Sequence, residues 1–224
     1  MKLCHLPQWL LAVLASLCLL ALAPQSAEAE GPASSPSFQV FLPLVMTVNS
    51  GAPASQETTP TYETFAASVA DGQAGVVRGV YAAEAFALRV EQQPAGDANY
   101  VSSNSETATQ FQTASLFGVT GLLAHNYLAG AKFSDLTDGQ EIRIVYGDGA
   151  AKRYAVSRVY RFQALDPYSP SSDFVDLETG ETLSALDVFS LVYMGEAHVT
   201  FQTCIEQNGT PSWGRLFVIA TPLD

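Results

Sequence analysis

The chain has 224 residues, of which 10 are Lys or Arg and 22 are Asp or Glu, so its formal net charge is −12. Hydrophobic residues make up 48% and charged residues only 14%, a balance that excludes disorder along the whole chain. The length suits one domain with extensions or two small domains. Because so few basic residues are available to neutralise phosphates, nucleic acids and anionic membrane surfaces are disfavoured as partners.

The N-terminus has the pattern of a secretory signal peptide over residues 1–29. Lys2 precedes an apolar run from Leu10 to Ala23, and Ala27-Glu28-Ala29 is a small-x-small cleavage site. The apolar run is shorter than the roughly 20 residues that a transmembrane helix needs. We therefore expect cleavage after Ala29 and export to the cell surface, with an uncleaved N-terminal membrane anchor as the alternative.

Two of the three cysteines, Cys4 and Cys18, lie in this signal segment. Cleavage would leave Cys204 as the only cysteine of the mature chain. A single thiol in an exported protein has no internal disulfide partner, so it is buried and inert, intermolecular, or reactive.

Residues 30–74 are rich in Pro, Ser, Thr, Ala and Gly, which is typical of an extended linker. An apolar stretch at 38–46 interrupts the linker. This stretch could pack on the following domain as an edge strand or lie near the cell envelope, and the sequence does not distinguish the two. The main domain is expected over residues 75–224.

This main domain carries mostly β-strand signals, with alternating or continuous apolar runs between turns. The expected strands are 85–91, 117–125, 141–146, 152–160, 197–203 and 215–220, with a hairpin turn at 147–149 and a loop at 206–214. Helical signals are few: one or two turns over 62–69, and a short helix or a further strand over 183–192. The pattern predicts an all-β barrel or sandwich.

Cys204 follows the strand expected at 197–203, at a position where reactive groups are often displayed. A nucleophilic cysteine needs a partner that exchanges a proton, most often histidine. His5 lies in the signal segment, and His198 would be ~20 Å from the thiol along an extended strand. His125, at the end of the strand expected at 117–125, is the remaining candidate.

Arg215 opens the strand that follows the expected loop. Strands joined by a loop are usually neighbours, so Arg215 is expected beside Cys204. A guanidinium there would favour the thiolate and stabilise an oxyanion on an attacked carbonyl. Taken alone, Arg215 also fits a solvated surface residue. The sole mature cysteine, the reachable His125 and Arg215 together favour a cysteine active site.

In these features the sequence resembles the sortase family. The segment 199–204 is similar to that family's strand ending in Thr-Cys, and 215–220 to its Arg-led apolar strand. The segment 121–126 is similar to its apolar strand ending in a catalytic histidine, and 133–145 to the region that follows. The order His, Cys, Arg along the chain is also that of the family. Ala124 and Asn126 depart from it, since Gly and Arg often flank that histidine.

The resemblance implies a closed sortase-type β-barrel of about eight strands with short helices. It also implies a cysteine transpeptidase that cleaves a sorting-signal peptide through a thioacyl intermediate. Cys204 would be the nucleophile, His125 the general acid and base, and Arg215 the stabiliser of the oxyanion. Candidate substrate-binding residues are Thr203, Asn126 and Trp213, the last of which suggests a pocket particular to this chain.

The implied partners are a peptide or protein bearing a sorting motif and an amine acceptor, either a cell-wall peptide or a lysine. The motif, the acceptor and the balance of transpeptidation against hydrolysis stay open. Other classes fit less well: papain-type peptidases place Cys before His, and L,D-transpeptidases carry a Ser-His-Gly-Cys type motif. The main alternative is a secreted binding module that keeps the barrel but has an impaired site.

No cofactor and no protein-bound metal are expected from the residue pattern. One mature Cys and scattered carboxylates do not have zinc-ligand spacing. Calcium is the one ion that the resemblance allows, because some sortases use it. The acidic residues that would be considered for it are Asp166, Asp173, Asp176, Glu178 and Glu181, although they do not follow an EF-hand pattern and a solvated acidic loop explains them better.

Overall fold

The computed structural model describes residues 59–224. The expected signal peptide at 1–29 and the apolar stretch at 38–46 lie outside the described residues. In chain order the elements are α1 (Tyr62–Val69), β1 (Val77–Ala82), β2 (Phe86–Gln92), β3 (Thr107–Phe111), α2 (Gln112–Ser115), β4 (Thr120–Leu123), η2 (Ala129–Asp135), β5 (Glu141–Tyr146), β6 (Ala151–Ala164), β7 (Phe174–Asp176), β8 (Thr182–Leu183), α3 (Ala185–Tyr193), β9 (Val199–Gln207) and β10 (Thr210–Pro222).

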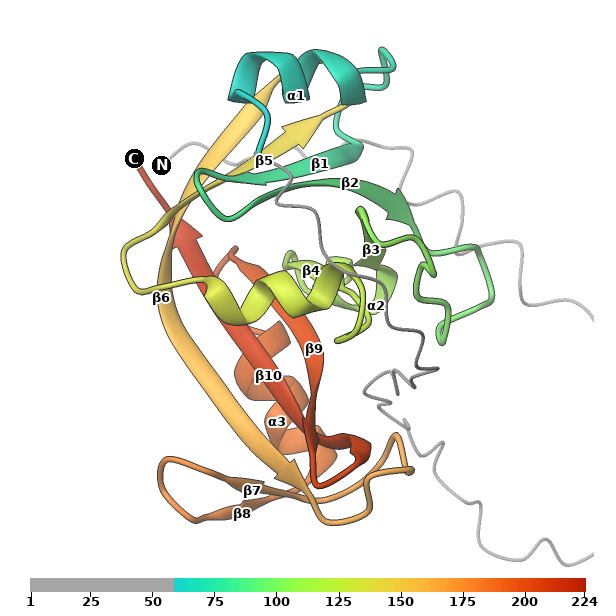
Figure 1. Ribbon diagram of the computed structural model, residues 1–224, viewed down its shortest axis with the longest axis vertical. Helices are drawn as coiled ribbons and strands as arrows, with labels where there is room; N and C mark the ends of the chain where they lie inside the picture. Colours follow the sequence, from blue (N-terminus) through green and yellow to red (C-terminus); the bar gives the residue numbers. More distant parts are fainter. Residues whose placement is uncertain (1–58) are drawn as a thin grey trace, which may run out of the picture. The chain divides into compact units, whose positions relative to one another are not determined.

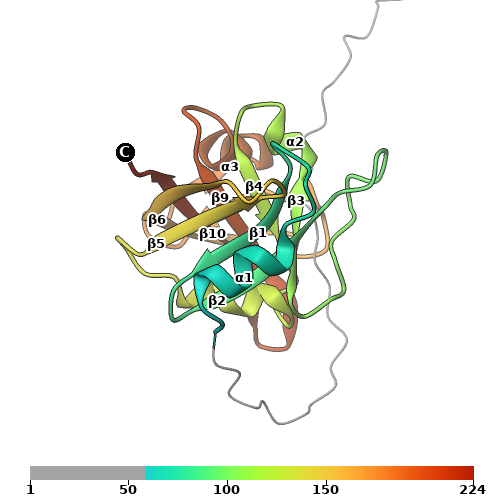
Figure 2. The same cartoon turned by 90° about the horizontal axis from the view of Figure 1, so that it is seen from above.

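Eight of the ten strands form a closed barrel (Figures 1 and 2). The order around it is β10-β9-β4-β3-β2-β1-β5-β6, and pairing of β6 with β10 closes the ring. The pairs β2–β3 and β4–β9 are parallel, and the other barrel pairs are antiparallel. The strands β7 and β8 extend from β6 outside the ring. The predicted closed barrel of about eight strands with short helices is therefore confirmed.

Side chains alternate along the barrel strands between an inner core and an outer face. The inner core contains mainly aliphatic residues from every barrel strand, together with Phe133 of η2. On β9 and β10 its members are Val199, Phe201, Leu216, Val218 and Ala220. Figure 1 shows η2 lying across the front of β9 and β10.

The outer face of β9 and β10 is covered by α3, which Figure 1 shows behind these strands. Phe189, Val192 and Tyr193 of α3 pack in a second core with Phe217 and Leu123. A capping box starts the helix, with the Ser184 side chain and that of Asp187 each accepting from the other's backbone N–H. The region for which the sequence left helix and strand open is thus a helix. No helix within residues 59–224 is both long and apolar enough for a membrane span.

The packed domain begins before Gly75, because α1 falls in the range expected for the linker. Thr61 caps this helix by accepting from the backbone N–H of Thr64. Phe65 packs against β1, where a Cβ on Gly79 would come within 2.8 Å of the Phe65 ring. Glycine at position 79 therefore allows the helix to lie directly on the barrel.

The loop expected at 206–214 is mostly strand. β9 continues to Gln207 and β10 starts at Thr210, so Asn208 and Gly209 alone form the turn. Both have positive φ values, 53° and 76°, which is the conformation that an Asn-Gly hairpin turn favours. The expectation of a long loop was wrong, and Cys204 lies within β9 rather than after it.

Candidate active site

Cys204 and Arg215 are directly opposite each other in the antiparallel ladder of β9 and β10. The register is regular from Gly214 to Ala220, so no bulge separates the two positions. Side chains of directly opposed residues lie on the same face of a sheet. The expectation that Arg215 lies beside Cys204 agrees with this register.

His125 reaches the same level from the other side of β9. The parallel strand β4 pairs Leu123 with Gln202, and the N–H of Ala124 donates to the carbonyl of Gln202 at 3.2 Å. Continuing this register by two residues brings His125 level with Cys204. The three residues thus occupy one level across the neighbouring strands β4, β9 and β10.

The alternation of side chains also places these residues on one face. Leu123 and Phe217 belong to the outer core under α3, and Gln202 accepts a hydrogen bond from the hydroxyl of Tyr193 in that helix. Cys204 lies two residues beyond Gln202, so it faces outward as well. His125 and Arg215 have the same relation to Leu123 and Phe217.

Arg215 is fully buried and has only part of its hydrogen-bonding capacity satisfied. Its Nη1 donates to the carbonyls of Ser212 and Gly214, both at 2.9 Å, while Nε and Nη2 have no protein partner. The ring of Phe174 lies 5.9 Å from its Cζ. Burial lowers the pKa of Arg215, and the electrostatic interaction with Cys204 opposes that effect.

Cys204 itself is only 4% exposed. Arg215 has no carboxylate partner within residues 59–224, so its burial has a large desolvation cost. A thiolate on Cys204, directly opposite in the ladder, is an anion that would offset this cost. Arg215 is therefore placed where it could stabilise a thiolate on Cys204.

His125 is half buried, and burial lowers its pKa from the usual 6.5, while a backbone hydrogen bond with Val101 opposes that shift. Its Nδ1 is buried and has no protein hydrogen-bond partner. The ring of Tyr127 lies 5.2 Å from the imidazole, centroid to centroid. A neutral imidazole with an unused ring nitrogen suits a group that accepts and returns a proton.

The backbone after His125 is held tightly. The N–H groups of Leu128 and Gly130 donate to the His125 carbonyl at 2.9 and 3.0 Å. A Cβ on Gly130 would contact Thr203 Oγ1 and would lie 2.6 Å from the carbonyl oxygen of Ala124. Glycine at position 130 thus permits the close turn that orients the histidine segment.

Asn126 joins this segment to the β9–β10 hairpin. Its Nδ2 donates to the carbonyl of Pro211 at 3.1 Å, a contact between positions 85 residues apart in sequence. The two chain segments that flank Cys204 are therefore tied to each other across the site.

Unsatisfied polar atoms collect around this level. Within residues 59–224, the buried side-chain nitrogen and oxygen atoms without a protein hydrogen-bond partner are His125 Nδ1, Asn126 Oδ1, Thr203 Oγ1, Ser212 Oγ, Arg215 Nε and Arg215 Nη2. Buried polar groups are normally satisfied, and exceptions concentrate at functional sites. These six atoms lie on or next to the strand segments that carry the three candidate catalytic residues.

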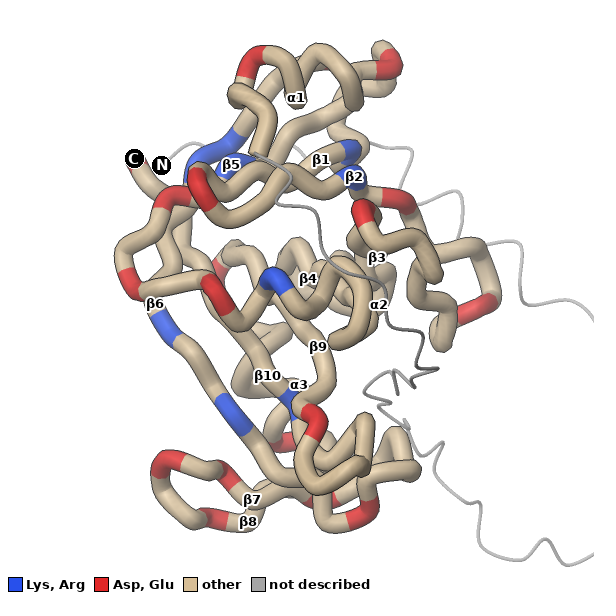
Figure 3. The backbone as a smooth tube through the Cα atoms, in the orientation of Figure 1, with Lys and Arg blue, Asp and Glu red and all other residues tan. Residues whose placement is uncertain are grey.

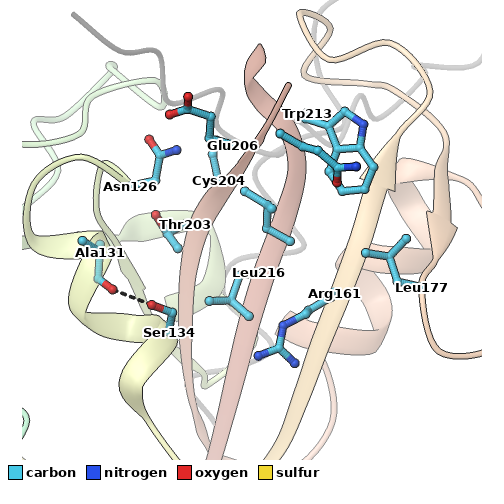
Figure 4. A pocket seen from close by; sticks show the side chains of 13 residues that line it. Asn126, Ala131, Ser134, Arg161, Leu177, Thr203, Cys204, Glu206, Trp213 and Leu216 are labelled. Carbon is cyan, nitrogen blue, oxygen red and sulfur yellow. Dashed lines mark hydrogen bonds between the residues drawn. The ribbon is translucent and has the colours of Figure 1, made fainter. Parts of the chain in front are cut away.

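A pocket of about 370 Å³ adjoins Cys204 and brings together all three residues proposed to bind substrate, namely Asn126, Thr203 and Trp213 (Figure 4). Neither His125 nor Arg215 lines it. Part of the pocket lies on the inner face, since its residues Thr203 and Leu216 oppose each other in the ladder and Leu216 belongs to the inner core. Cys204 and Glu206 also line it, so the pocket reaches the thiol.

His198, which the sequence excluded as the partner of Cys204, makes contacts elsewhere. Its ring nitrogens lie 2.7 Å from the carbonyl of Glu196 and 3.0 Å from that of Val192. Those contacts connect the end of α3 to the start of β9. Sequence reasoning did not identify Ser212, Phe174 or Gly130, because their importance comes from contacts with Arg215 and His125 rather than from any motif.

No group of three or more His, Cys, Asp or Glu side chains within the described range is arranged to hold a metal ion. Three of the acidic residues considered for calcium, Asp166, Asp176 and Glu178, make local contacts. Asp176 accepts from the backbone N–H of Glu178, whose carboxylate pairs with Arg158 at 3.0 Å. Figure 3 shows acidic positions in the β7–β8 hairpin and basic ones along β6.

No protein-family model and no curated protein matches the sequence. A search of solved structures finds sortases, the family that the sequence resembles. Sortase A of Listeria monocytogenes is 13% identical, covering 69% of this chain and 89% of its own, with a TM-score of 0.43. Sortase C-1 of Actinomyces oris is 12% identical, covering 84% and 91%, with a TM-score of 0.47. The sortase D5 transpeptidase of Clostridium perfringens is 12% identical, covering 74% and 90%, with a TM-score of 0.44.

Proposed function

We propose that the protein is a cysteine transpeptidase that cleaves a peptide through a thioacyl intermediate on Cys204. The observation that carries this proposal is the common level and common face of His125, Cys204 and Arg215 on three neighbouring strands. Nucleophile, proton carrier and fixed cation are the three groups that acyl transfer by a thiol requires.

In the proposed first step, neutral His125 takes the proton of the Cys204 thiol, and the thiolate attacks the scissile peptide carbonyl and forms a C–S bond. The negative charge that develops on the carbonyl oxygen is stabilised by Arg215, whose Nε and Nη2 have no protein partner. The C–N bond then breaks, and His125 delivers a proton to the departing amine. The products are a thioacyl enzyme and the released C-terminal fragment.

In the second step, an acceptor amine attacks the thioester carbonyl while His125 takes its proton. Collapse of the intermediate breaks the C–S bond, and the released Cys204 thiolate takes the proton back from His125. When water takes the place of the amine, the thioester is hydrolysed by the same route. The proposed acceptors are a cell-wall peptide or a lysine, and the proposed donor is a peptide or protein with a sorting motif.

The site of action follows from the N-terminal sequence. The apolar run and the small-x-small motif of residues 1–29 favour export. We infer that the enzyme works at the cell surface, where polypeptide donors and amine-bearing wall peptides meet.

One observation favours a different function. Cys204 is only 4% exposed and Arg215 is fully buried, so other side chains cover both residues in this structure. A secreted binding module with an impaired site would have such a closed thiol permanently. An enzyme would open it when a peptide binds.

The two functions are separated by incubating the full-length protein with a library of Leu-Pro-containing peptides, with and without an amine acceptor, followed by mass spectrometry. The enzyme forms an acyl adduct on Cys204 and, with amine, a transfer product. Cys204→Ala is the matched control and forms neither. Absence of any adduct across a broad library favours the binding module.

A further inference from the structure

The pocket beside Cys204 has a cation at one end that the proposed chemistry does not use. Arg161 of β6 opposes Leu216 of β10, and Leu216 opposes Thr203 of β9, so the three residues form one row across the strands. All three line the pocket. The Cys204–Arg215 level lies one residue along and faces the other side of the sheet.

Arg161 stands apart from the other cations within residues 59–224. Five of them make ion pairs: Arg78, Lys132, Arg143, Arg153 and Arg158. Arg89 donates to a backbone carbonyl, Lys152 lies over a tyrosine ring, and Arg215 is held by two carbonyls. None of these contacts occurs for Arg161. In a chain of net charge −12, this guanidinium at the pocket is available to an outside anion.

The remaining walls of the pocket are largely apolar. Leu177, Ile205, Trp213 and Leu216 line it, and Figure 4 shows Arg161 among Leu216 and Leu177. Arg161 is exposed, so its guanidinium can be reached from solvent, and the apolar body of an acid can pack against these walls.

The opposite end of the pocket has the reverse charge. Glu206 lies beside Asn126 and Cys204 in Figure 4, away from Arg161. A second acidic group on the ligand would meet this carboxylate and be repelled. Thr203, 3% exposed, adds a hydroxyl without a protein partner at the pocket wall.

We propose that this pocket, which Cys204 also lines, binds a ligand with one carboxylate on an apolar body. Arg161 binds the carboxylate, and the apolar walls, Trp213 included, cover the body. The volume of about 370 Å³ suits a small acid or an acidic side chain with an apolar neighbour. Two kinds of ligand carry a carboxylate on an apolar body, a free organic acid and an acidic peptide.

The test uses Trp213 as its own reporter. The chain has two tryptophans, Trp9 and Trp213, so full-length protein carrying Trp9→Phe reports the pocket alone. Tryptophan fluorescence is followed during titration with 4-phenylbutyrate and with acetyl-Leu-Glu-amide. Their neutral counterparts, 4-phenylbutyramide and acetyl-Leu-Gln-amide, are titrated in parallel, and the two arms distinguish the free acid from the peptide.

At least one acid is expected to bind about tenfold or more tightly than its amide, which corresponds to about 1.4 kcal/mol. Arg161→Gln removes that preference. Arg158→Gln, three residues away on the same strand and paired with Glu178, keeps it. Equal binding of acid and amide, no binding of any probe, or a preference that survives Arg161→Gln overturns the proposal. Because the readout is binding, these results do not depend on whether Cys204 is acylated.

Discussion

Arg215 is opposed to Cys204 across the β9–β10 ladder and is buried completely, with two of its three guanidinium nitrogens lacking a protein partner. A residue that served only stability would rarely be an arginine at such a position, because a buried charge has a large desolvation cost. This conflict between stability and charge leads to the first prediction.

Arg215→Met is expected to leave the free energy of unfolding unchanged or to raise it, by up to about 4 kcal/mol, because it replaces a buried charge with an apolar side chain of similar length. The same change is expected to abolish acyl-adduct formation on Cys204. Urea unfolding and mass spectrometry measure the two effects. A large loss of stability would mean that the guanidinium has a structural role.

Gly130→Ala is expected to destabilise the fold by about 1–3 kcal/mol and to slow acylation, because the new methyl group meets Thr203 and the carbonyl oxygens of residues 124 and 125. Denaturant unfolding and the rate of adduct formation are the measurements. Ser134→Ala in the same helix η2 is the control, since it removes only a hydrogen bond to the Ala131 carbonyl. Equal effects of the two substitutions would contradict the proposed steric role of residue 130.

The half-buried His125 makes the free energy of unfolding depend on pH in a defined direction. Burial lowers the pKa of His125 below its usual 6.5, so the unfolded chain binds the proton more readily than the folded one. Its contribution is fully present above pH 6.5 and is lost as the pH falls toward the lowered value. The free energy of unfolding should therefore fall less between pH 7.5 and 5.5 in His125→Asn than in the wild type. Identical pH dependence in both proteins would show that burial does not perturb this group.

Asn126→Ala removes the hydrogen bond to the Pro211 carbonyl and is expected to increase the access of reagents to Cys204. A lost hydrogen bond of about 1 kcal/mol corresponds to roughly a fivefold larger open population. The rate of Cys204 alkylation by iodoacetamide should rise by that factor. Asn99→Ala, at an exposed loop position, should leave the rate unchanged. A rate unaffected by Asn126→Ala would show that another contact controls access.

Much of the barrel could be predicted because its hairpins carry local signals. The alternation of β5 and the glycines at 147 and 149 indicated the β5–β6 hairpin, and the register bears this out. The β9–β10 hairpin was missed in part, because Ser, Pro and Gly around Asn208 and Gly209 resemble a loop. The closing pair β6–β10 brings distant segments together and has no local signal.

The sequence indicated which strands carry the site residues, but not which face of the sheet each side chain occupies. Strand adjacency was enough to place Arg215 beside Cys204. Thr203, however, precedes Cys204 in the same strand, so alternation alone requires it to face the other side. Its expected substrate role did not take that into account, and Thr203 lines the pocket together with Trp213 and Cys204. The cover over Arg215 comes from Phe174, which lies 41 residues away in sequence.

The most direct test of the central claim is the pH dependence of Cys204 alkylation in the wild type, His125→Ala and Arg215→Met. If Cys204 is a nucleophile activated by these neighbours, the wild-type thiol reacts at lower pH than an ordinary cysteine of pKa about 8.5. Each substitution then moves the profile toward higher pH. A thiol that stays inert in the folded wild-type protein, or reacts identically in all three proteins, would contradict the proposed catalytic site.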